Sequence, residues 1–294
     1  MDSLKTRKLE LEILKQYNLP RHKMDRVTKE LYTLTQGEKG ERNTAYYIDF
    51  ELKHSPNWVV IHDLRLEKGD DTAQIDHLLI NRFLEFYVLE TKAFSGTLQM
   101  LDDGSFLSIY DKKSYVENSP VSQNNRHIKL LRNILQERSL MPKRLGIPLS
   151  PSFESFILLD KTKFIRPNKC ASSMVLRSDQ FIDRLHKELE EVSFRSGIKQ
   201  ISKVVSQETL RELGANIVAL HKKGNINYKE LFGITNEDLN SNSTNIASNH
   251  EPQKTSNYCA QCKTDIPSVV AKFCFERKAR FGGRAYCRDC QNDY

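Results

Sequence analysis

Two neighbouring apolar segments carry charged residues where a buried strand would normally exclude them, and this pattern constrains the fold more than any other. The segments are residues 74–80 (QIDHLLI) and 86–92 (FYVLETK), with the turn-like pair Asn81-Arg82 just after the first. Both are short and rich in aliphatic and aromatic residues, which predicts two strands. We expect them to pair as an antiparallel hairpin.

The charged residues of this hairpin are expected to converge at one end. Asp76 lies at the head of the first predicted strand, and Glu90 and Lys92 lie at the tail of the second. Residues two apart on a strand point to the same face, so Glu90 and Lys92 would face one side together. Two close carboxylates repel each other, and a divalent cation, Mg²⁺ or Mn²⁺, would relieve that repulsion. From spacing alone, a surface hairpin with an incidental ion pair remains open as an alternative.

Four short blocks of sequence occur in order around the hairpin. They are residues 37–41 (GEKGE), 74–77 (QIDH), 90–92 (ETK) and 120–123 (PVSQ). A helical stretch with Arg126, His127, Leu130 and Leu131 follows the last block. Over residues 31 to 140 the chain thereby resembles the nuclease-related domain (NERD), a branch of the PD-(D/E)xK nuclease superfamily. It departs from the family pattern at Ser119, which separates Asn118 from Pro120, and in having a single Asp for the superfamily's first signature pair.

The resemblance implies an α/β fold with a restriction-endonuclease-like core, in which helices flank a mixed central sheet. It implies that Asp76 and Glu90 ligate Mg²⁺, with the backbone carbonyl of Thr91 as a further ligand. Lys92 would position or activate the attacking water.

Two helical residues are implied at the same site. Glu41 would be the acidic residue of the first core helix, and Gln123 the polar residue of a later helix that faces the site. A solvated helix face is the alternative for Glu38 and Glu41, and we prefer it for Glu38. A helix-surface position remains open for Gln123.

Hydrophobic patterns elsewhere agree with an α/β chain. Helical periodicity predicts helices over residues 3–17, from about residue 24 through Gly37 and Gly40, from Pro120 onward, after residues 178–180, and over about 208–223. Apolar runs predict strands over residues 58–61, 96–100, 106–110, 156–159 and 173–176.

Composition and charge suggest the partner and the domain plan. The net charge of +7 over 294 residues favours a polyanionic partner such as nucleic acid. For the nuclease that the resemblance implies, we expect DNA as the substrate. No apolar run approaches the roughly 20 residues that span a bilayer, and the first residues lack a signal-peptide core, so we expect a cytoplasmic protein with no membrane partner. We expect an N-terminal helical extension (1–30), the nuclease-like domain (31–233), a flexible linker rich in Asn, Ser and Thr (234–257) and a cysteine module (258–294).

The cysteine module contains two CxxC pairs, Cys259/Cys262 and Cys287/Cys290. In a short cytoplasmic segment with few apolar residues, this spacing predicts a structural Zn²⁺ held by four thiolates. Disulfides are the alternative. Cys274, between the pairs, is expected to fill a small core instead.

The basic residues of this module gather in residues 277–284 (RKARFGGR). Arg277, Lys278, Arg280 and Arg284, with an aromatic residue among them, would contact phosphates and stack on a base. A zinc-clamped hairpin whose charges only keep it soluble remains open, as does a protein partner. The chain as a whole is therefore predicted to be a Mg²⁺-dependent nuclease with a tethered zinc module, the alternative being an inactive nuclease-like adaptor for nucleic acid or protein.

Overall fold

The computed structural model describes residues 3–94, 96–166, 174–195, 204–224, 226–240, 257–266 and 268–293. The chain divides into two compact units, Met1–Asp238 and Leu239–Tyr294. Each unit has its own hydrophobic core.

The first unit is built on a five-stranded sheet with the strand order β1-β2-β3-β9-β11. Its strands are β1 (Trp58–Lys68), β2 (Asp71–Asn81), β3 (Glu85–Lys92), β9 (Ser152–Leu159) and β11 (Val175–Arg177). Short turns join the first three strands, which therefore pair antiparallel, whereas β9 is reached by a long crossover and pairs parallel with β3 and β11. The predicted mixed sheet is confirmed.

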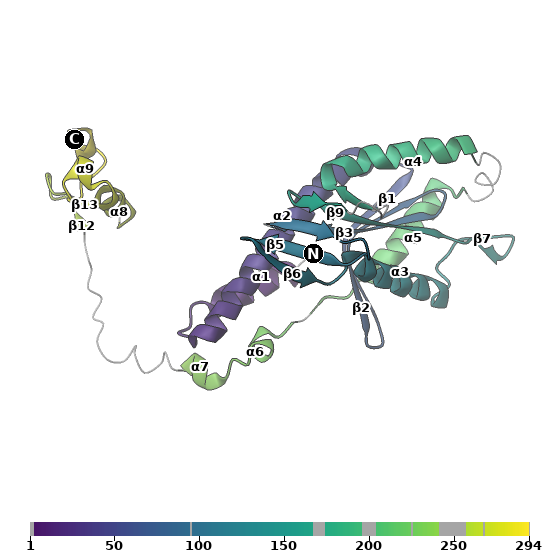
Figure 1. Cartoon of the computed structure of the whole chain (residues 1–294), viewed down its shortest axis with the longest axis horizontal. Helices are drawn as coiled ribbons and strands as arrows, with labels where there is room; N and C mark the ends of the chain where they lie inside the picture. Colours follow the sequence, from purple (N-terminus) through teal and green to yellow (C-terminus); the bar gives the residue numbers. More distant parts are fainter. Residues whose placement is uncertain are drawn as a thin grey trace. The chain divides into compact units, whose positions relative to one another are not determined.

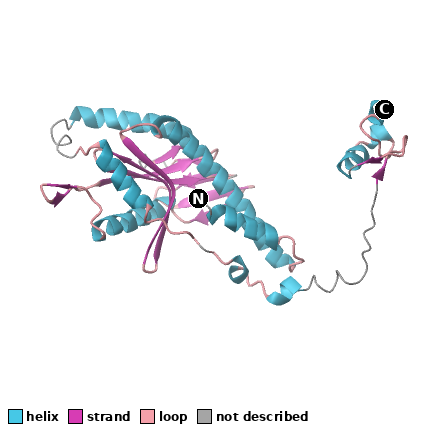
Figure 2. Ribbon diagram, turned by 180° about the vertical axis from the view of Figure 1, so that it is seen from behind, coloured by secondary structure: helices cyan, strands magenta, loops and turns pink. Residues whose placement is uncertain are grey.

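Helices cover both faces of this sheet (Figures 1 and 2). They are α2 (Arg21–Leu52), α3 (Pro120–Glu137), α4 (Phe181–Arg195) and α5 (Gln207–Val218), while α1 (Ser3–Leu14) packs against α2. Leu131 and Leu213 place α3 and α5 in one core cluster with Val88. Ile48 and Leu185 place α2 and α4 in another cluster with Leu89. Since Val88 and Leu89 are consecutive in β3, they point to opposite faces, and the two clusters lie on opposite sides of the sheet.

Helix α2 runs through Gly37 and Gly40 without interruption, as predicted. A Cβ atom at Gly40 would lie 2.8 Å from the Cβ atom of Ala93, just beyond β3. At Gly37 the nearest atom would be Glu41 Oε1, 3.9 Å away. Only Gly40 is therefore required for the close approach of α2 to the end of β3.

Helix α3 begins at the position where the sequence departs from the family pattern. Ser119 is its N-cap, and the Ser119 side chain accepts a hydrogen bond from the backbone N–H of Ser122. Pro120 occupies the first turn, where its fixed φ suits a helix and its missing N–H costs nothing. The extra residue thus satisfies a free donor at the start of the helix.

A second sheet has the order β10-β4-β5-β6. Its strands are β4 (Thr97–Met100), β5 (Phe106–Tyr110), β6 (Lys113–Glu117) and β10 (Lys163–Ile165). Phe106 packs in a core cluster with Ile157 and Leu159 of β9, which joins the two sheets. Strands β4 and β5 confirm the predictions for residues 96–100 and 106–110, while β6 is largely exposed and has no apolar alternation that would predict it.

The remaining elements of this unit are short. They are β7 (Lys143–Arg144), β8 (Ile147–Pro148), the 3₁₀ helix η1 (Ser178–Gln180), α6 (Tyr228–Leu231) and α7 (Asn236–Asn240). The helix predicted over 208–223 ends at Val218, and beyond it the backbone N–H of Lys222 donates to the carbonyl of Arg65 in β1. The predicted linker (234–257) includes α7, whose Asp238 accepts a hydrogen bond from Lys23 at 2.6 Å. Residues 241–256 of that linker, and residue 173 of the strand predicted over 173–176, lie outside the described residues.

The second unit contains β12 (Asn257–Tyr258), β13 (Asp265–Ile266), α8 (Ser268–Glu276), α9 (Lys278–Phe281) and the 3₁₀ helix η3 (Cys290–Asp293). Ile266, Phe281 and Tyr286 are buried in its core. This core is small, so a further stabilising element such as a metal centre fits its size.

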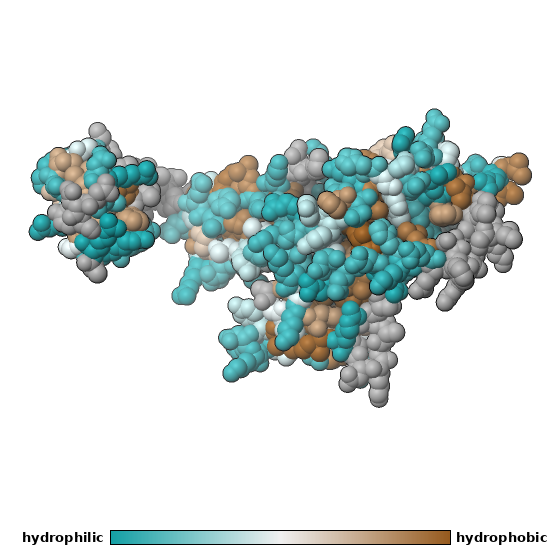
Figure 3. Space-filling model, turned by 90° about the horizontal axis from the view of Figure 1, so that it is seen from above, coloured by the Kyte–Doolittle hydropathy of each residue, from teal (hydrophilic) through white to brown (hydrophobic). Residues whose placement is uncertain are grey.

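The surface is mainly polar where it is drawn in Figure 3, with hydrophobic residues in smaller patches. None of the helices in the described part of the chain combines the length and the apolar character needed to cross a membrane. The apolar stripes of α3 and α5 are buried against the sheet instead.

Candidate functional site

The predicted hairpin is formed by β2 and β3, and it brings Asp76 beside Glu90. The β2–β3 pairing ends at His77 and Leu89, which are paired with each other. Asp76 lies directly before His77 and Glu90 lies directly after Leu89, so both carboxylates are at the same end of the hairpin. The prediction that Asp76 heads its strand is wrong. Strand β2 begins at Asp71, because its first residues pair with β1 and not with β3.

Side chains at the end of β3 form a closed hydrogen-bonded group with α3. Lys92 Nζ donates to Glu90 Oε1 at 2.7 Å and to Gln123 Oε1 at 3.2 Å. Gln123 Nε2 donates to the same Glu90 oxygen at 2.9 Å. Between Glu90 and Lys92, the backbone N–H of Thr91 donates to Asp76 Oδ2 at 2.7 Å. The structure thus brings four of the predicted side chains together.

Glu41 reaches this group from α2, one residue after the glycine that packs against Ala93. Burial raises the pKa of Glu41 to about 7, and the carboxylates of Asp63 and Glu90 add to the rise. Glu38, by contrast, forms an ion pair with a lysine of α1 at 2.6 Å. Of the two glutamates in this block, only Glu41 has a pKa that the charge of Glu90 raises.

The carboxylates at the centre of the group are poorly solvated. Burial raises the pKa of Asp76 well above its ordinary value, and the charges of Glu90 and Glu41 raise it further. Burial also raises the pKa of Glu90, although Lys92 and Gln123 oppose the rise. Negative charge is therefore held at a cost here, and a divalent cation would relieve that cost.

Asp63 is an acidic neighbour that sequence analysis missed. It lies in β1 between the residues that pair with His77 and Ile75, which places it opposite Asp76. Its φ of 57° is unusual for a residue other than glycine, and its carboxylate accepts a hydrogen bond from Gln74 at 2.6 Å. The apolar run that predicted this strand stops before Asp63, so no pattern pointed to it.

His127 is a second missed neighbour. It follows Gln123 by one helical turn on α3, and its Nδ1 lies 3.6 Å from Glu90 Oε2. Burial lowers the pKa of His127 to about 4, and the charges of Lys92 and Arg126 lower it further. The imidazole is therefore neutral near pH 7 and forms no ion pair with Glu90. In the sequence, His127 stood out only as part of the helical stretch that follows the fourth block.

A chain of polar side chains supports the group from the opposite face of the sheet. His62 Nε2 lies 3.0 Å from Asp49 Oδ1, and the Nδ1 atoms of His62 and His77 lie 2.7 Å apart. His77 Nε2 in turn lies 3.1 Å from Thr91 Oγ1. This chain fixes Thr91, whose backbone N–H holds Asp76.

Two grooves open beside the group. The first has a volume of 620 Å³ and lies between α2 and the segment after β3. It is lined by Lys29, Tyr32, Thr33, Gln36, Lys39, Ala93, Phe94, Glu117, Asp160 and Lys161. The second has a volume of 480 Å³, and Gln123 and His127 line it together with Arg126 and Lys129. Both grooves expose cationic side chains, and the second is lined by Gln123 of the hydrogen-bonded group.

The carboxylates do not form a closed metal cage in this structure. Among the described residues, only the four cysteines of the second unit form a group of three or more ligating side chains whose atoms all lie within 4.8 Å of one another. Near the carboxylates, however, the described atoms Glu90 Oε2 and His127 Nδ1 are buried and have no hydrogen-bond partner. Two such atoms and the raised carboxylate pKa values fit a bound cation.

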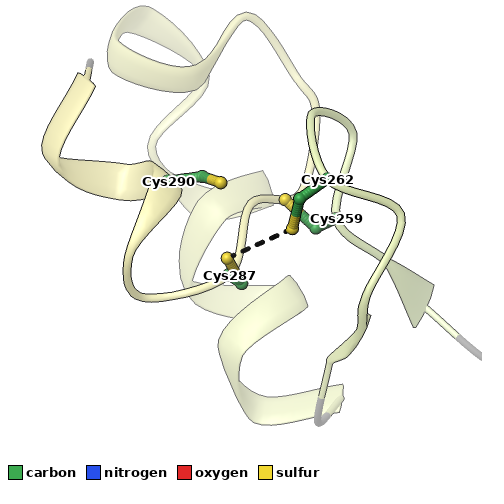
Figure 4. A group of neighbouring side chains, drawn as sticks. All are labelled: Cys259, Cys262, Cys287 and Cys290. Carbon is green, nitrogen blue, oxygen red and sulfur yellow. Dashed lines mark hydrogen bonds between the residues drawn. The ribbon is translucent and has the colours of Figure 1, made fainter.

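Figure 4 shows Cys259, Cys262, Cys287 and Cys290 with their sulfur atoms turned toward a common centre. Cys262 Sγ and Cys287 Sγ lie 3.6 Å apart, and none of the five described cysteines is in a disulfide. Burial would raise the pKa of Cys259, but backbone N–H groups of Cys262 and Cys287 lower it to about 6. The arrangement is compatible with a structural zinc ion.

Cys274 lies in the core of this unit and is not a member of the four-cysteine group. It is fully buried, and its sulfur accepts hydrogen bonds from the backbone N–H of Tyr286 and from Gln291 Nε2. A packing role is therefore sufficient to explain it.

The four basic residues predicted to bind nucleic acid are all exposed. Two of them lie over aromatic rings of their own unit: Arg277 is 3.8 Å from the Phe273 ring centre, and Arg280 is 4.9 Å from that of Phe281. Lys278 and Arg284 flank this pair in sequence.

Comparison with known proteins gives a match to one family. Residues 36–158 match the family model described as the nuclease-related domain (NERD). The matched segment contains Glu41, the β2–β3 hairpin and the first helix after it. No curated protein and no solved structure matches this chain.

Proposed function

From the nuclease-related domain that this chain contains, we propose that the protein is a divalent-metal-dependent nuclease that hydrolyses phosphodiester bonds, with DNA as its substrate. The observation that carries the proposal is the meeting of Glu41, Asp76, Glu90 and Lys92 from a helix and two strands at one buried point. Such a grouping costs stability, and a metal-dependent reaction at phosphorus gives it a use.

In this proposal, Asp76, Glu90 and the carbonyl of Thr91 hold Mg²⁺ or Mn²⁺. The cation, when bound, supplies positive charge next to the phosphate and lowers the pKa of water. The Thr91 N–H orients Asp76 through its 2.7 Å hydrogen bond, which leaves the second Asp76 oxygen for the cation.

Lys92 acts on the reacting phosphate and water, and Gln123 holds Lys92 in position. The ammonium of Lys92 is held 2.7 Å from Glu90, and it donates a hydrogen bond to a phosphate oxygen or orients the attacking water. Gln123 keeps Lys92 and Glu90 in register through its two hydrogen bonds. Glu41 completes the acidic side of the site from α2.

The grooves and the overall charge support a nucleic acid as substrate. Lys29, Lys39 and Lys161 line the first groove together with Tyr32, so phosphates and a base find partners next to the end of β3. Glu117 and Asp160 in the same groove would keep the backbone away from its acidic side. The net charge of +7 adds long-range attraction for a polyanion.

The proposal is tested by incubating the full chain with linear DNA, circular DNA and RNA in Mg²⁺, in Mn²⁺ and in EDTA. We expect cleavage of DNA with either cation and none with EDTA. Lys92→Ala should lower the maximal rate about 100- to 1,000-fold, the typical effect of removing one transition-state donor. Lys113→Ala, on the exposed strand β6, is the matched control and should cleave like the wild type.

Two outcomes would count against the proposal. Wild-type rates in Lys92→Ala would place the chemistry elsewhere. Tight DNA binding with no cleavage under any cation would favour the nuclease-like adaptor, in which the same grooves bind nucleic acid without turnover.

A further inference from the structure

The two oxygens of Glu90 face different partners. Glu90 Oε1 already accepts hydrogen bonds from Lys92 Nζ and Gln123 Nε2. Glu90 Oε2 is buried, has no hydrogen-bond partner among the described residues and faces His127 Nδ1 at 3.6 Å. Any cation held by Glu90 therefore finds Oε2 as its open ligand.

His127 Nδ1 is the only described nitrogen facing that oxygen without a hydrogen bond of its own. A separation of 3.6 Å is too long for a direct hydrogen bond between the two atoms. Oxygen and nitrogen ligands each bind a transition metal at about 2.1 Å, so both atoms can reach one ion across this gap.

Position and packing make the His127 ring a fixed partner. It lies one turn after Gln123 on α3, and Gln123 is itself hydrogen-bonded to Glu90, so the helix holds both side chains against the same carboxylate. Only 7 % of His127 is exposed, which leaves the imidazole little freedom to turn away. His127 also lines the 480 Å³ groove, which gives a cation a path to the pair.

We propose that His127 Nδ1 is a nitrogen ligand of the cation held by Glu90 Oε2. This inference rests on the proposed nuclease function. It implies that the site favours transition cations that accept imidazole, such as Mn²⁺ or Co²⁺, over Mg²⁺, which takes oxygen ligands almost exclusively.

The test uses the full chain with Mn²⁺ and measures binding separately from cleavage. Electron paramagnetic resonance gives the Mn²⁺ affinity, and pulsed measurement of ¹⁴N modulation detects an imidazole nitrogen bound to the ion. We expect ¹⁴N modulation in the wild type and its loss in His127→Gln, with Mn²⁺ affinity lowered about 10- to 100-fold, as for other groups that tune a metal site. Mg²⁺ affinity should change less.

His54→Gln is the matched control, because His54 is exposed beyond the end of α2. It should keep both the modulation and the affinity of the wild type. His127→Phe retains a buried ring but has no ligand atom, so it should lose the ¹⁴N modulation as His127→Gln does. Comparing the two variants shows whether a failure to fold explains the loss in either of them.

The outcomes separate this inference from the proposed function. Bound Mn²⁺ without ¹⁴N modulation in the wild type, or modulation that persists in both folded His127 variants, overturns the inference even where cleavage is seen. Modulation that depends on His127 without cleavage of any nucleic acid upholds the inference and counts against nuclease activity.

Discussion

At the scale of single residues, burial outweighs charge pairing in the candidate site. Glu90 lies 2.7 Å from the Lys92 ammonium, yet its pKa is raised, because the desolvation of a buried carboxylate exceeds the gain from its partner. The pKa of Asp76 is raised well above its ordinary value, because burial and the charges of Glu90 and Glu41 outweigh the Thr91 N–H and the charge of Lys92. The metal-free site is thus a local source of instability.

Replacing Asp76 tests this cost directly. Asp76→Asn keeps an oxygen for the Thr91 N–H but removes a buried charge close to Glu90 and Glu41. We expect the metal-free variant to be at least as stable as the wild type in urea unfolding, and its cleavage rate to fall about 100-fold or more. Asp70→Asn, in the exposed turn before β2, should change neither quantity, and wild-type cleavage by Asp76→Asn would contradict the proposed ligand.

The pKa of Glu41 predicts a pH dependence of stability. Its value rises from 4.5 in the unfolded chain to about 7 in the fold, so the folded state binds the proton more tightly. The stability that Glu41 contributes is therefore complete below pH 4.5 and is lost as the pH rises through about 7.

We expect Glu41→Gln to remove this loss in the metal-free protein. The free energy of unfolding of wild type minus variant should fall between pH 4.5 and 7, when both are measured in EDTA. Glu38→Gln serves as the control, because its pKa is lowered and not raised. A flat difference across this range would mean that Glu41 is well solvated.

At the scale of secondary-structure elements, the sequence predicted the parts that have a periodic apolar pattern. Strands β2 and β3 were predictable because their apolar runs are bounded by a turn, and α2 because its stripe continues beyond Gly40. Asp63 and His127 were not predictable as site residues. Their proximity to the carboxylates depends on the β1–β2 register and on the rotation of α3, and a single sequence specifies neither.

The contact between α2 and β3 gives a prediction with its own control. Gly40→Ala would place a methyl group 2.8 Å from Ala93 Cβ, so the helix must move away from the end of β3. We expect a loss of about 1–3 kcal/mol in unfolding free energy and slower cleavage, because Glu41 moves with the helix.

Gly37→Ala is the matched substitution three residues earlier on the same helix. It meets no atom closer than 3.9 Å, so helix propensity should dominate and raise stability by about 1 kcal/mol. Equal effects of the two substitutions on stability would contradict the close approach at Gly40.

At the scale of the whole molecule, two units of different construction share one chain. The first buries large apolar side chains between a sheet and its helices, and the second gathers four cysteines around a small core. We propose that the second unit holds one structural Zn²⁺ and serves as a tethered nucleic-acid-binding arm, which raises the local concentration of the first unit on a bound strand. Native mass spectrometry should find one zinc per chain, and its absence would contradict the coordination by Cys259, Cys262, Cys287 and Cys290.

Removing the second unit separates catalysis from targeting. A chain ending at Asn240 keeps α7 and its Asp238–Lys23 ion pair, so we expect a folded unit with the same metal-dependent cleavage and weaker DNA binding.

The basic residues of the second unit can be tested with the double variant Lys278→Ala/Arg284→Ala. We choose these two because Arg277 and Arg280 also pack on aromatic rings of their own unit. The slope of the logarithm of the binding constant against the logarithm of the salt concentration should become shallower by about 1 for each phosphate that the variant no longer neutralises. Lys272→Ala, at an exposed position of α8, is the matched control. If the shortened and full chains bind DNA equally across a salt titration, the cysteine unit is not a nucleic-acid arm, and its exposed charges are better explained by a protein partner.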